Sequence, residues 1–225
     1  MRKMDKSPLK IDVVSDVMCP WCYIGKRRLE SAIAGIDLVL DIRWLPFQLD
    51  PTLPAGGKDR KAYLAEKFGS IERARQLYEN IRAAGDAENI PFAFNRIEVS
   101  PNTLDAHRLI RWAGDVGDTM QDRVVEALFK AYFLDGEHIG EHDTLVRIAK
   151  DAGMDAGLVA ELLAGDTDRE LVTSEIAQAQ AMGVSGVPTF IIANKYTLVG
   201  AQPAARLAEA IRTIATQQNA NDNVA

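Results

Sequence analysis

Hydrophobic and polar positions divide the chain into three parts, of which the first has a sheet and helix pattern. Residues 11–14 read Ile-Asp-Val-Val and residues 38–45 are rich in branched side chains, so both segments predict strands. Between them, Leu29 and Ile33 have helical spacing and predict a helix over residues 23–34. A strand, a helix and a strand in this order predict a βαβ unit with parallel strands and a right-handed crossover.

The middle part, residues 58–182, is helical throughout and carries no strand signal. A breaker-rich connection at residues 50–57, Asp-Pro-Thr-Leu-Pro-Ala-Gly-Gly, separates it from the first part. Residues 124–133 carry a wide apolar stripe, which predicts a buried helix. We therefore expect an all-helical domain over residues 58–182.

The sheet pattern returns in the last part of the chain. Residues 189–192 and 196–199 predict two strands, and the turn residues Ala-Asn-Lys between them predict a hairpin. Residues 202–218 predict a final helix, and the polar tail over residues 219–225 is expected to fray.

The sheet-forming segments at the two chain ends predict one sheet built from both. The order βαβ, insertion, α, ββα is that of a thioredoxin-like fold in the α/β class, interrupted by a large all-helical insertion domain. We expect a discontinuous thioredoxin-like domain from residues 8–57 and 183–218, with residues 58–182 as the insertion.

Composition and charge exclude several classes of partner. The chain has 225 residues, with 26 Lys and Arg against 32 Asp and Glu, for a net charge of −6. An acidic surface repels phosphate backbones, so we expect no nucleic-acid partner. No run of 18 apolar residues occurs, and the charged N-terminus is followed by Ile-Asp-Val-Val-Ser-Asp rather than an apolar leader segment. We therefore expect a cytoplasmic protein without a membrane partner.

The two cysteines form a redox motif, Cys19-Pro-Trp-Cys22, at the start of the first helix. Pro20 suits the first helical turn, where its missing N–H costs nothing. A helix N-terminus favours the thiolate, so we assign Cys19 as nucleophile and Cys22, one turn further in, as the resolving thiol. The charge of Asp16 would oppose this if its side chain points inward, and the sequence leaves its direction open.

A second candidate site is the segment Gly-Val-Ser-Gly-Val-Pro-Thr-Phe over residues 183–190. A proline directly before a strand needs a reason, and a cis bond between Val187 and Pro188 is one. The backbone of Val187 would then be free to pair with an extended substrate. Pro20 and Trp21 lie between the cysteines, flank the sulfur and are predicted to contact substrate, with Trp21 as an exposed platform.

The three histidines indicate no metal site. A zinc site needs about four ligands, which two cysteines and the histidines supply only in a fold that the pattern does not predict. We interpret His107 as a partly buried packing residue, and His138 and His142 as parts of a solvated loop.

Residues 14–26, Val-Ser-Asp-Val-Met-Cys-Pro-Trp-Cys-Tyr-Ile-Gly-Lys, together with residues 183–190 resemble the DsbA-type thioredoxin family. The likeness is to its FrnE-like branch of dithiol–disulfide isomerases and extends to Asn-Thr-Leu-Asp-Ala-His-Arg at residues 102–108 and Gly-Ala-Gln-Pro at residues 200–203. It implies redox work at the two cysteines on thiols or disulfides of proteins or small molecules. It implies no bound cofactor beyond exchange with glutathione or another dithiol, and it allows a homodimer.

Two other functions remain open at this point. The same superfamily contains kappa-class transferases and 2-hydroxychromene-2-carboxylate isomerases, which use glutathione and resemble this chain except that they carry serine in place of Cys19. A non-catalytic, peptide-binding holdase would use the Val187 edge and the helical insertion. Neither alternative explains why Cys22 is present.

Overall fold

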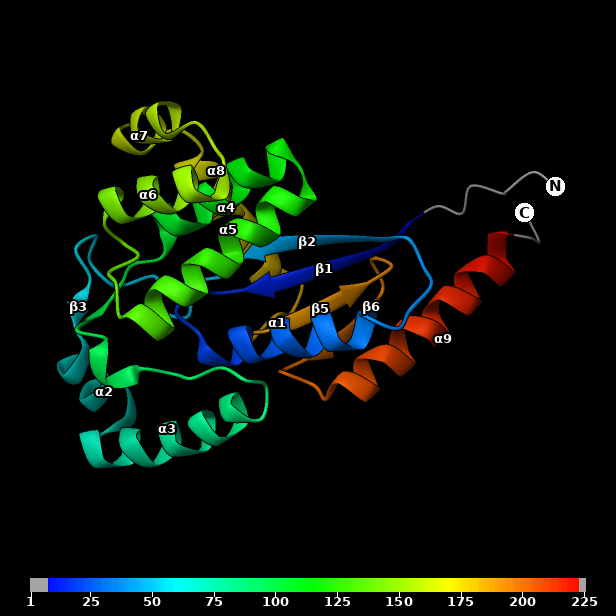
Figure 1. Ribbon diagram of the computed structural model, residues 1–225, viewed down its shortest axis with the longest axis horizontal. Coiled ribbons are helices and arrows are strands. Elements are labelled where there is room, and N and C mark those ends of the chain that lie inside the picture. The colour runs from blue at the N-terminus through cyan, green and yellow to red at the C-terminus, as the bar shows by residue number, and fades with distance from the viewer. Residues whose placement is uncertain (1–7, 223–225) are drawn as a thin grey trace.

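A four-stranded sheet in the order β2-β1-β5-β6 forms the centre of the computed structural model, which describes residues 8–222 (Figure 1). Its strands are β1 (Leu9–Ser15), β2 (Leu40–Pro46), β5 (Thr189–Ile192) and β6 (Tyr196–Val199). β1 and β2 are parallel, with Val13 opposite Trp44, while β5 and β6 are antiparallel to their neighbours. The prediction that both chain ends share one sheet is confirmed.

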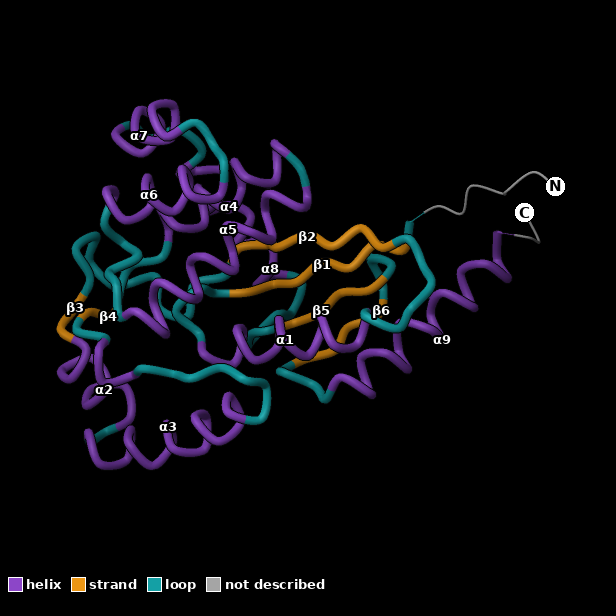
Figure 2. The backbone as a smooth tube through the Cα atoms, in the orientation of Figure 1, coloured by secondary structure: helices purple, strands orange, loops and turns teal. Residues whose placement is uncertain are grey.

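Helices cover both faces of this sheet because its side chains alternate in direction. α1 (Pro20–Ile33) and α9 (Ala204–Asp222) pack on the face that contains Val13, while α8 (Arg169–Ala181) packs on the face that contains Val14. The backbone trace in Figure 2 shows α1 crossing in front of the strands. The order β1-α1-β2-α8-β5-β6-α9 is that of a thioredoxin-like fold, as the sequence predicts.

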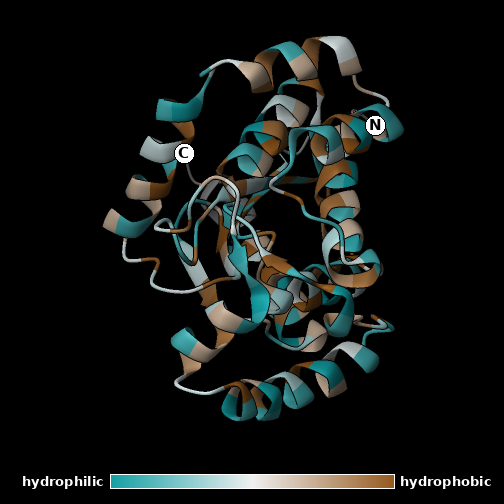
Figure 3. Cartoon of the chain, turned by 90° about the vertical axis from the view of Figure 1, so that its left-hand side faces the viewer, coloured by the Kyte–Doolittle hydropathy of each residue, from teal (hydrophilic) through white to brown (hydrophobic). Residues whose placement is uncertain are grey.

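Six helices lie between β2 and α8. They are α2 (Arg60–Phe68), α3 (Ile71–Asp86), α4 (Leu104–Val116), α5 (Asp118–Lys130), α6 (His142–Ala152) and α7 (Ala156–Ala164), joined by short helical turns at Phe94–Arg96 and Ala131–Asp135. Hydrophobic and hydrophilic residues follow one another along the helical ribbons of the chain (Figure 3). Within the described residues, none of the helices has the length and apolar character of a membrane span.

The expectation that the middle part contains no strand is wrong. β3 (Lys58–Asp59) and β4 (Val99–Ser100) pair in an antiparallel ladder at the base of α2. Two residues are too few to show the alternation that predicts a strand. The division of the chain at residues 58 and 182 stays a prediction.

Several boundaries also shift. α1 begins at Pro20, the proline expected in the first turn, three residues ahead of the apolar spacing that starts at residue 23. α9 continues to Asp222, so residues 219–222 of the expected tail are helical. The rest of that tail, residues 223–225, lies outside the described residues. β5 and β6 have the predicted bounds.

Aromatic packing joins α1 to the middle of the chain. The Tyr23 ring stacks on Phe129 with 4.9 Å between ring centroids and meets Phe92 edge to face at 6.1 Å. On the next turn of α1, the buried Lys26 forms an ion pair with Asp122 of α5 at 2.9 Å. These contacts hold the start of α1, and with it the cysteine pair, against the helices that follow β2.

Candidate active site

Cys19 caps the N-terminus of α1. Its backbone N–H donates to the Asp16 carbonyl at 3.0 Å, and its own carbonyl accepts from the Cys22 N–H at 3.0 Å. Pro20 occupies the first turn, as the sequence predicts. Both thiols are reduced. The unpaired N–H groups of this helix end favour negative charge at the position that Cys19 occupies.

Cys22 lies behind Cys19 and is fully buried, whereas Cys19 keeps 4% of its surface exposed. Burial raises the pKa of the Cys22 thiol well above its usual range, and the hydrogen bond with Cys19 and the charge of that sulfur raise it further. The Ser15 hydroxyl and the Asp16 backbone act in the opposite direction. Cys22 is therefore held as a protonated thiol in the reduced protein.

The loop before β5 completes the sulfur environment. The Val187–Pro188 peptide bond is cis, as predicted, and the Val187 carbonyl oxygen lies 3.8 Å from the Cys19 sulfur. Gly25 of α1 faces this loop so closely that a Cβ at this position would stand 2.7 Å from Pro188 Cγ. The first turns of α1 and the Pro188 loop thus form one packed unit.

A cavity of about 430 Å³ opens in front of Cys19. One wall comes from the dithiol motif and the Val187 loop, and the opposite wall comes from α2 and α3. Trp21 lines this cavity and is 38% exposed, so the predicted exposure of its side chain is confirmed. The lining is Met18, Cys19, Pro20, Trp21, Leu49, Arg60, Tyr63, Leu64, Lys67, Phe68, Leu77, Tyr78, Asn80, Ile81, Gly186 and Val187.

Two cations in this cavity, Arg60 and Lys67, were not among the candidates from the sequence. They lie on α2, about forty residues after the cysteines in a segment without a recognisable motif. Only the folding of α2 over the start of α1 brings them to Cys19. No local sequence signal identifies them.

Asp16 points inward and is fully buried. Its Oδ1 accepts from the Met18 N–H at 3.3 Å, and its Oδ2 accepts from the Leu49 N–H at 2.8 Å. His107 of α4 is also buried, more completely than expected, and its Nε2 lies 3.5 Å from Asp16 Oδ1. Among the described residues, this Nε2 has no hydrogen-bond partner with good geometry.

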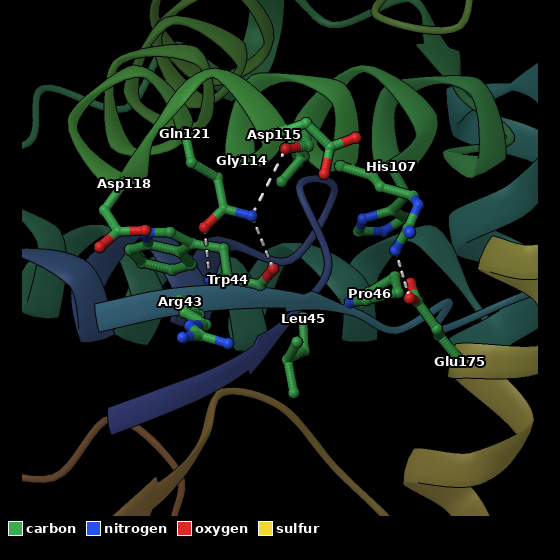
Figure 4. Close-up of a pocket in the computed structure, with 12 residues that line it drawn as sticks. Arg43, Trp44, Leu45, Pro46, His107, Gly114, Asp115, Asp118, Gln121 and Glu175 are labelled. Carbon is green, nitrogen blue, oxygen red and sulfur yellow. Dashed lines mark hydrogen bonds and ion pairs between the residues drawn. The ribbon is translucent and has the colours of Figure 1, made fainter. Parts of the chain in front are cut away.

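A second cavity of about 380 Å³ lies on the other side of His107, between β2 and helices α4, α5 and α8 (Figure 4). The ion pair of Arg111 with Glu175, 2.5 Å apart, stands at one end. At the other end, the Gln121 side chain accepts from the Trp44 N–H at 2.9 Å and donates to the Trp44 carbonyl at 3.2 Å. Trp44 Nε1, His107 Nε2 and Arg111 Nε belong to residues that line this cavity and have no hydrogen-bond partner among the described residues. The cavity contains neither cysteine.

The other two histidines lie far from the dithiol motif in the sequence. His138 Nε2 lies 3.1 Å from the Gly56 carbonyl, and His142 Nε2 lies 3.1 Å from Asp105 Oδ2. His142 is the first residue of α6 rather than a loop residue, because the preceding Glu141 provides the helix cap position. Over residues 8–222, no three His, Cys, Asp or Glu side chains gather in a way that could hold a metal ion.

A dithiol at the first helix of a thioredoxin fold, beside a cis-proline, defines the class of thiol–disulfide enzymes built on this fold. The chain belongs to the DSBA-like thioredoxin domain family, whose model matches residues 10–212. It is accordingly an enzyme of the disulfide oxidoreductase and isomerase type.

Three relatives illustrate how far the likeness extends. The uncharacterized protein YwbO of Bacillus subtilis is 26% identical over 187 residues, which cover 82% of this chain and 86% of YwbO. The crystal structure of a probable DsbA oxidoreductase from Streptomyces coelicolor is 30% identical, with a TM-score of 0.84 over 93% of this chain and 90% of that one. The cytosolic disulfide reductase DsbM from Pseudomonas aeruginosa, solved with GSH, shares the fold at 16% identity, with a TM-score of 0.62 over 96% of this chain and 100% of DsbM.

Proposed function

We propose that this protein exchanges disulfides through the Cys19–Cys22 pair, with Cys19 as nucleophile and Cys22 as resolving thiol. The observation that carries the proposal is their difference in access: Cys19 lines the open cavity at a helix N-terminus, while Cys22 is sealed behind it. The Cys19 thiolate attacks a substrate disulfide and releases one thiolate. Cys22 then attacks the mixed disulfide at Cys19, gives its proton to the second leaving sulfur and closes the enzyme disulfide.

Pro188 and Val187 would shape and pair the substrate beside the attacking sulfur. The Val187 carbonyl faces Cys19, so an extended substrate that donates an N–H to this oxygen would bring its disulfide to the nucleophile. Pro20 and Trp21 line the same cavity and would contact the group that flanks the disulfide.

The thiol partner is proposed to be glutathione or a dithiol. In support of glutathione, DsbM, a protein of this fold, has been solved with GSH. A glutathione-dependent transferase or isomerase would need only the first sulfur, so its activity would survive Cys22→Ser. A holdase would bind clients after both thiols are replaced. The resolving position of Cys22 favours the dithiol mechanism over both.

We further propose that the protein belongs to the FrnE-like branch, acts in the cytoplasm and has neither a membrane nor a nucleic-acid partner. The motifs at residues 14–26 and 183–190 support membership of this branch. The reducing conditions of the cytoplasm suit a disulfide that forms and is reduced during catalysis rather than a permanent structural disulfide. The homodimer stays a prediction, and sedimentation analysis of the purified chain tests it.

The reduction potential of the Cys19–Cys22 pair tests the proposed function. The protein is equilibrated with glutathione redox buffers, and the free thiols are counted by mass-tagging. We expect a reversible two-electron couple between about −270 and −120 mV, the range of known Cys-X-X-Cys proteins. A pair that never oxidises, or glutathione that adds to Cys19 and stays there, would contradict the dithiol mechanism and favour the glutathione-dependent alternative.

A further inference from the structure

The cavity in front of Cys19 is cationic, although the protein as a whole is acidic. Two of its lining side chains, Arg60 and Lys67, are cations, and none is an Asp or Glu. The whole chain has a net charge of −6. The local reversal of charge at the reactive sulfur therefore does not follow from the composition.

Arg60 is the more unusual of the two because it is buried without a carboxylate partner. The residue is 4% exposed, and its guanidinium donates only to hydroxyl groups: Tyr78 at 2.7 Å, Tyr132 at 3.1 Å and Ser100 at 3.3 Å. Within residues 8–222 no acidic side chain forms an ion pair with it. Arginine stays charged in proteins, and a buried charge without a counter-charge is costly.

The neutral partners of Arg60 accept hydrogen bonds from only some of its N–H groups. The guanidinium has five N–H groups, of which three donate to the hydroxyls named above. The rings of Tyr78 and Tyr132, 5.3 and 5.9 Å from the guanidinium carbon, add a weaker attraction. The nearby buried carboxylate of Asp16 accepts from two backbone N–H groups and does not line the cavity.

Lys67 lies about two turns further along α2, on the same face as Arg60, and donates to the Tyr63 hydroxyl at 2.7 Å. It also borders a neighbouring cavity that contains Asp50 and Glu66, so its charge is partly shared with these acids. Arg60 is thus the main unmatched charge, and Lys67 is a secondary one nearer the surface.

We propose that Arg60, assisted by Lys67, forms a carboxylate-binding subsite beside Cys19, and that the substrate is a small disulfide with carboxylate groups, such as glutathione disulfide. This rests on the proposed function and names its substrate class. A planar guanidinium matches a carboxylate through paired hydrogen bonds. The cavity volume of about 430 Å³ suits a small molecule, and the apolar side chains of Trp21, Leu64 and Leu77 would contact the uncharged part of this substrate.

The reaction at this subsite balances without a further reagent. The substrate carboxylate binds Arg60, the Cys19 thiolate forms a bond to the nearer substrate sulfur, and the substrate S–S bond breaks to release one thiolate. The Cys22 sulfur then bonds to Cys19, and its proton passes to the second substrate sulfur, which leaves as a thiol. The products are the enzyme disulfide, one substrate thiolate and one substrate thiol. Two electrons move from the protein to the substrate.

The test compares disulfides that differ in charge. The reduced full-length protein is mixed in single-turnover experiments with glutathione disulfide, its tetraethyl ester or the neutral hydroxyethyl disulfide, and its oxidation is followed by tryptophan fluorescence. We expect Arg60→Gln to lower the ratio of the glutathione disulfide rate to the neutral disulfide rate by about tenfold or more, as the loss of one charge-assisted contact predicts. Arg60→Lys should lower this rate ratio by a smaller factor. The control variant Arg75→Gln, which removes an exposed cation from α3, should leave the rate ratio unchanged.

A binding measurement separates this proposal from the proposed function. S-methylglutathione cannot exchange disulfides, so calorimetry with this probe reports the subsite alone, and we expect binding that weakens as salt rises and weakens further in Arg60→Gln. No binding to the wild-type protein would overturn the subsite even if the redox couple is present. An equal loss of rate with charged and neutral disulfides in Arg60→Gln, or a faster reaction with an acidic peptide disulfide than with glutathione disulfide, would also overturn it.

Discussion

The Cys19 sulfur and the Val187 carbonyl oxygen lie 3.8 Å apart, although the two residues are 168 positions apart in the chain. In the reduced protein the thiol is placed to donate a weak hydrogen bond to this carbonyl. A thiolate or a disulfide sulfur has no proton to donate, so the same carbonyl is then free to accept an N–H from the substrate. The Val187 carbonyl is therefore available to the substrate in the same states of Cys19, thiolate and disulfide, that take part in the exchange reaction.

Replacing Cys22 should trap the first half of the reaction. In Cys22→Ser the attacking sulfur remains while the resolving sulfur is gone, so we expect a stable mixed disulfide at position 19 and loss of turnover by at least about a hundredfold. Intact-protein mass spectrometry after exposure to a disulfide measures the adduct. Cys19→Ser is the matched control and should form no adduct; an adduct on Cys22 in that variant would reverse the assigned roles.

The resolving step should accelerate with pH. Burial holds the pKa of Cys22 well above its usual range, so around neutral pH only a small thiolate fraction attacks, and this fraction rises about tenfold per pH unit as long as the pH stays below the pKa. In the mixed disulfide the charge of Cys19 no longer contributes, but burial, the larger cause, remains. Stopped-flow decay of the mixed disulfide between pH 6 and 9 measures this; a plateau below pH 8 would contradict it.

A methyl group at Gly25 should separate α1 from the Pro188 loop. Its Cβ would meet Pro188 Cγ at 2.7 Å, and overpacking of this kind costs about 1–3 kcal/mol, against a gain of about 1 kcal/mol in helix propensity. We expect Gly25→Ala to lower the free energy of unfolding by up to about 2 kcal/mol in urea denaturation and to slow disulfide exchange. Gly35→Ala, where the added Cβ meets nothing within 4 Å, should change stability by less than about 0.5 kcal/mol.

Asp16 should stabilise the turn that carries Cys19. Asp16→Ala leaves the N–H groups of Met18 and Leu49 without their acceptor, at a cost of about 2–4 kcal/mol for the two hydrogen bonds. Asp16→Asn retains one acceptor oxygen and should lose about half as much. Urea denaturation measures the stability of both variants, and a double-mutant cycle with His107→Gln measures the coupling between Asp16 and His107. If Asp16→Ala were as stable as the wild-type protein, the carboxylate would not stabilise the turn.

Local pattern was sufficient to predict the sheet elements and the dithiol. The patterns of β5 and β6 identified both strands with their bounds. β5 is almost wholly apolar because it faces a core on both sides of the sheet, whereas β6 alternates because Tyr196 and Leu198 pack on the core and Thr197 and Val199 are exposed. The spacing of Cys19 and Cys22 and the proline before β5 are also local signals, so the dithiol and the cis bond were predictable. The two-residue strands β3 and β4 gave no such signal and were missed.

Tertiary structure alone decided what surrounds the sulfur. Whether Asp16 faces inward, which residue approaches it and which side chains line the cavity all depend on where α2, α3 and α4 settle against α1. Arg60 and His107 each belong to helices whose own sequence explains their amphipathic pattern, but not their neighbours across the fold. Periodicity along the sequence shows which face of a helix is buried, but the packing of the whole chain decides what that face contacts. For this reason the sequence by itself determined the dithiol chemistry of Cys19 and Cys22, and only the tertiary structure decided which charged side chains surround the Cys19 sulfur.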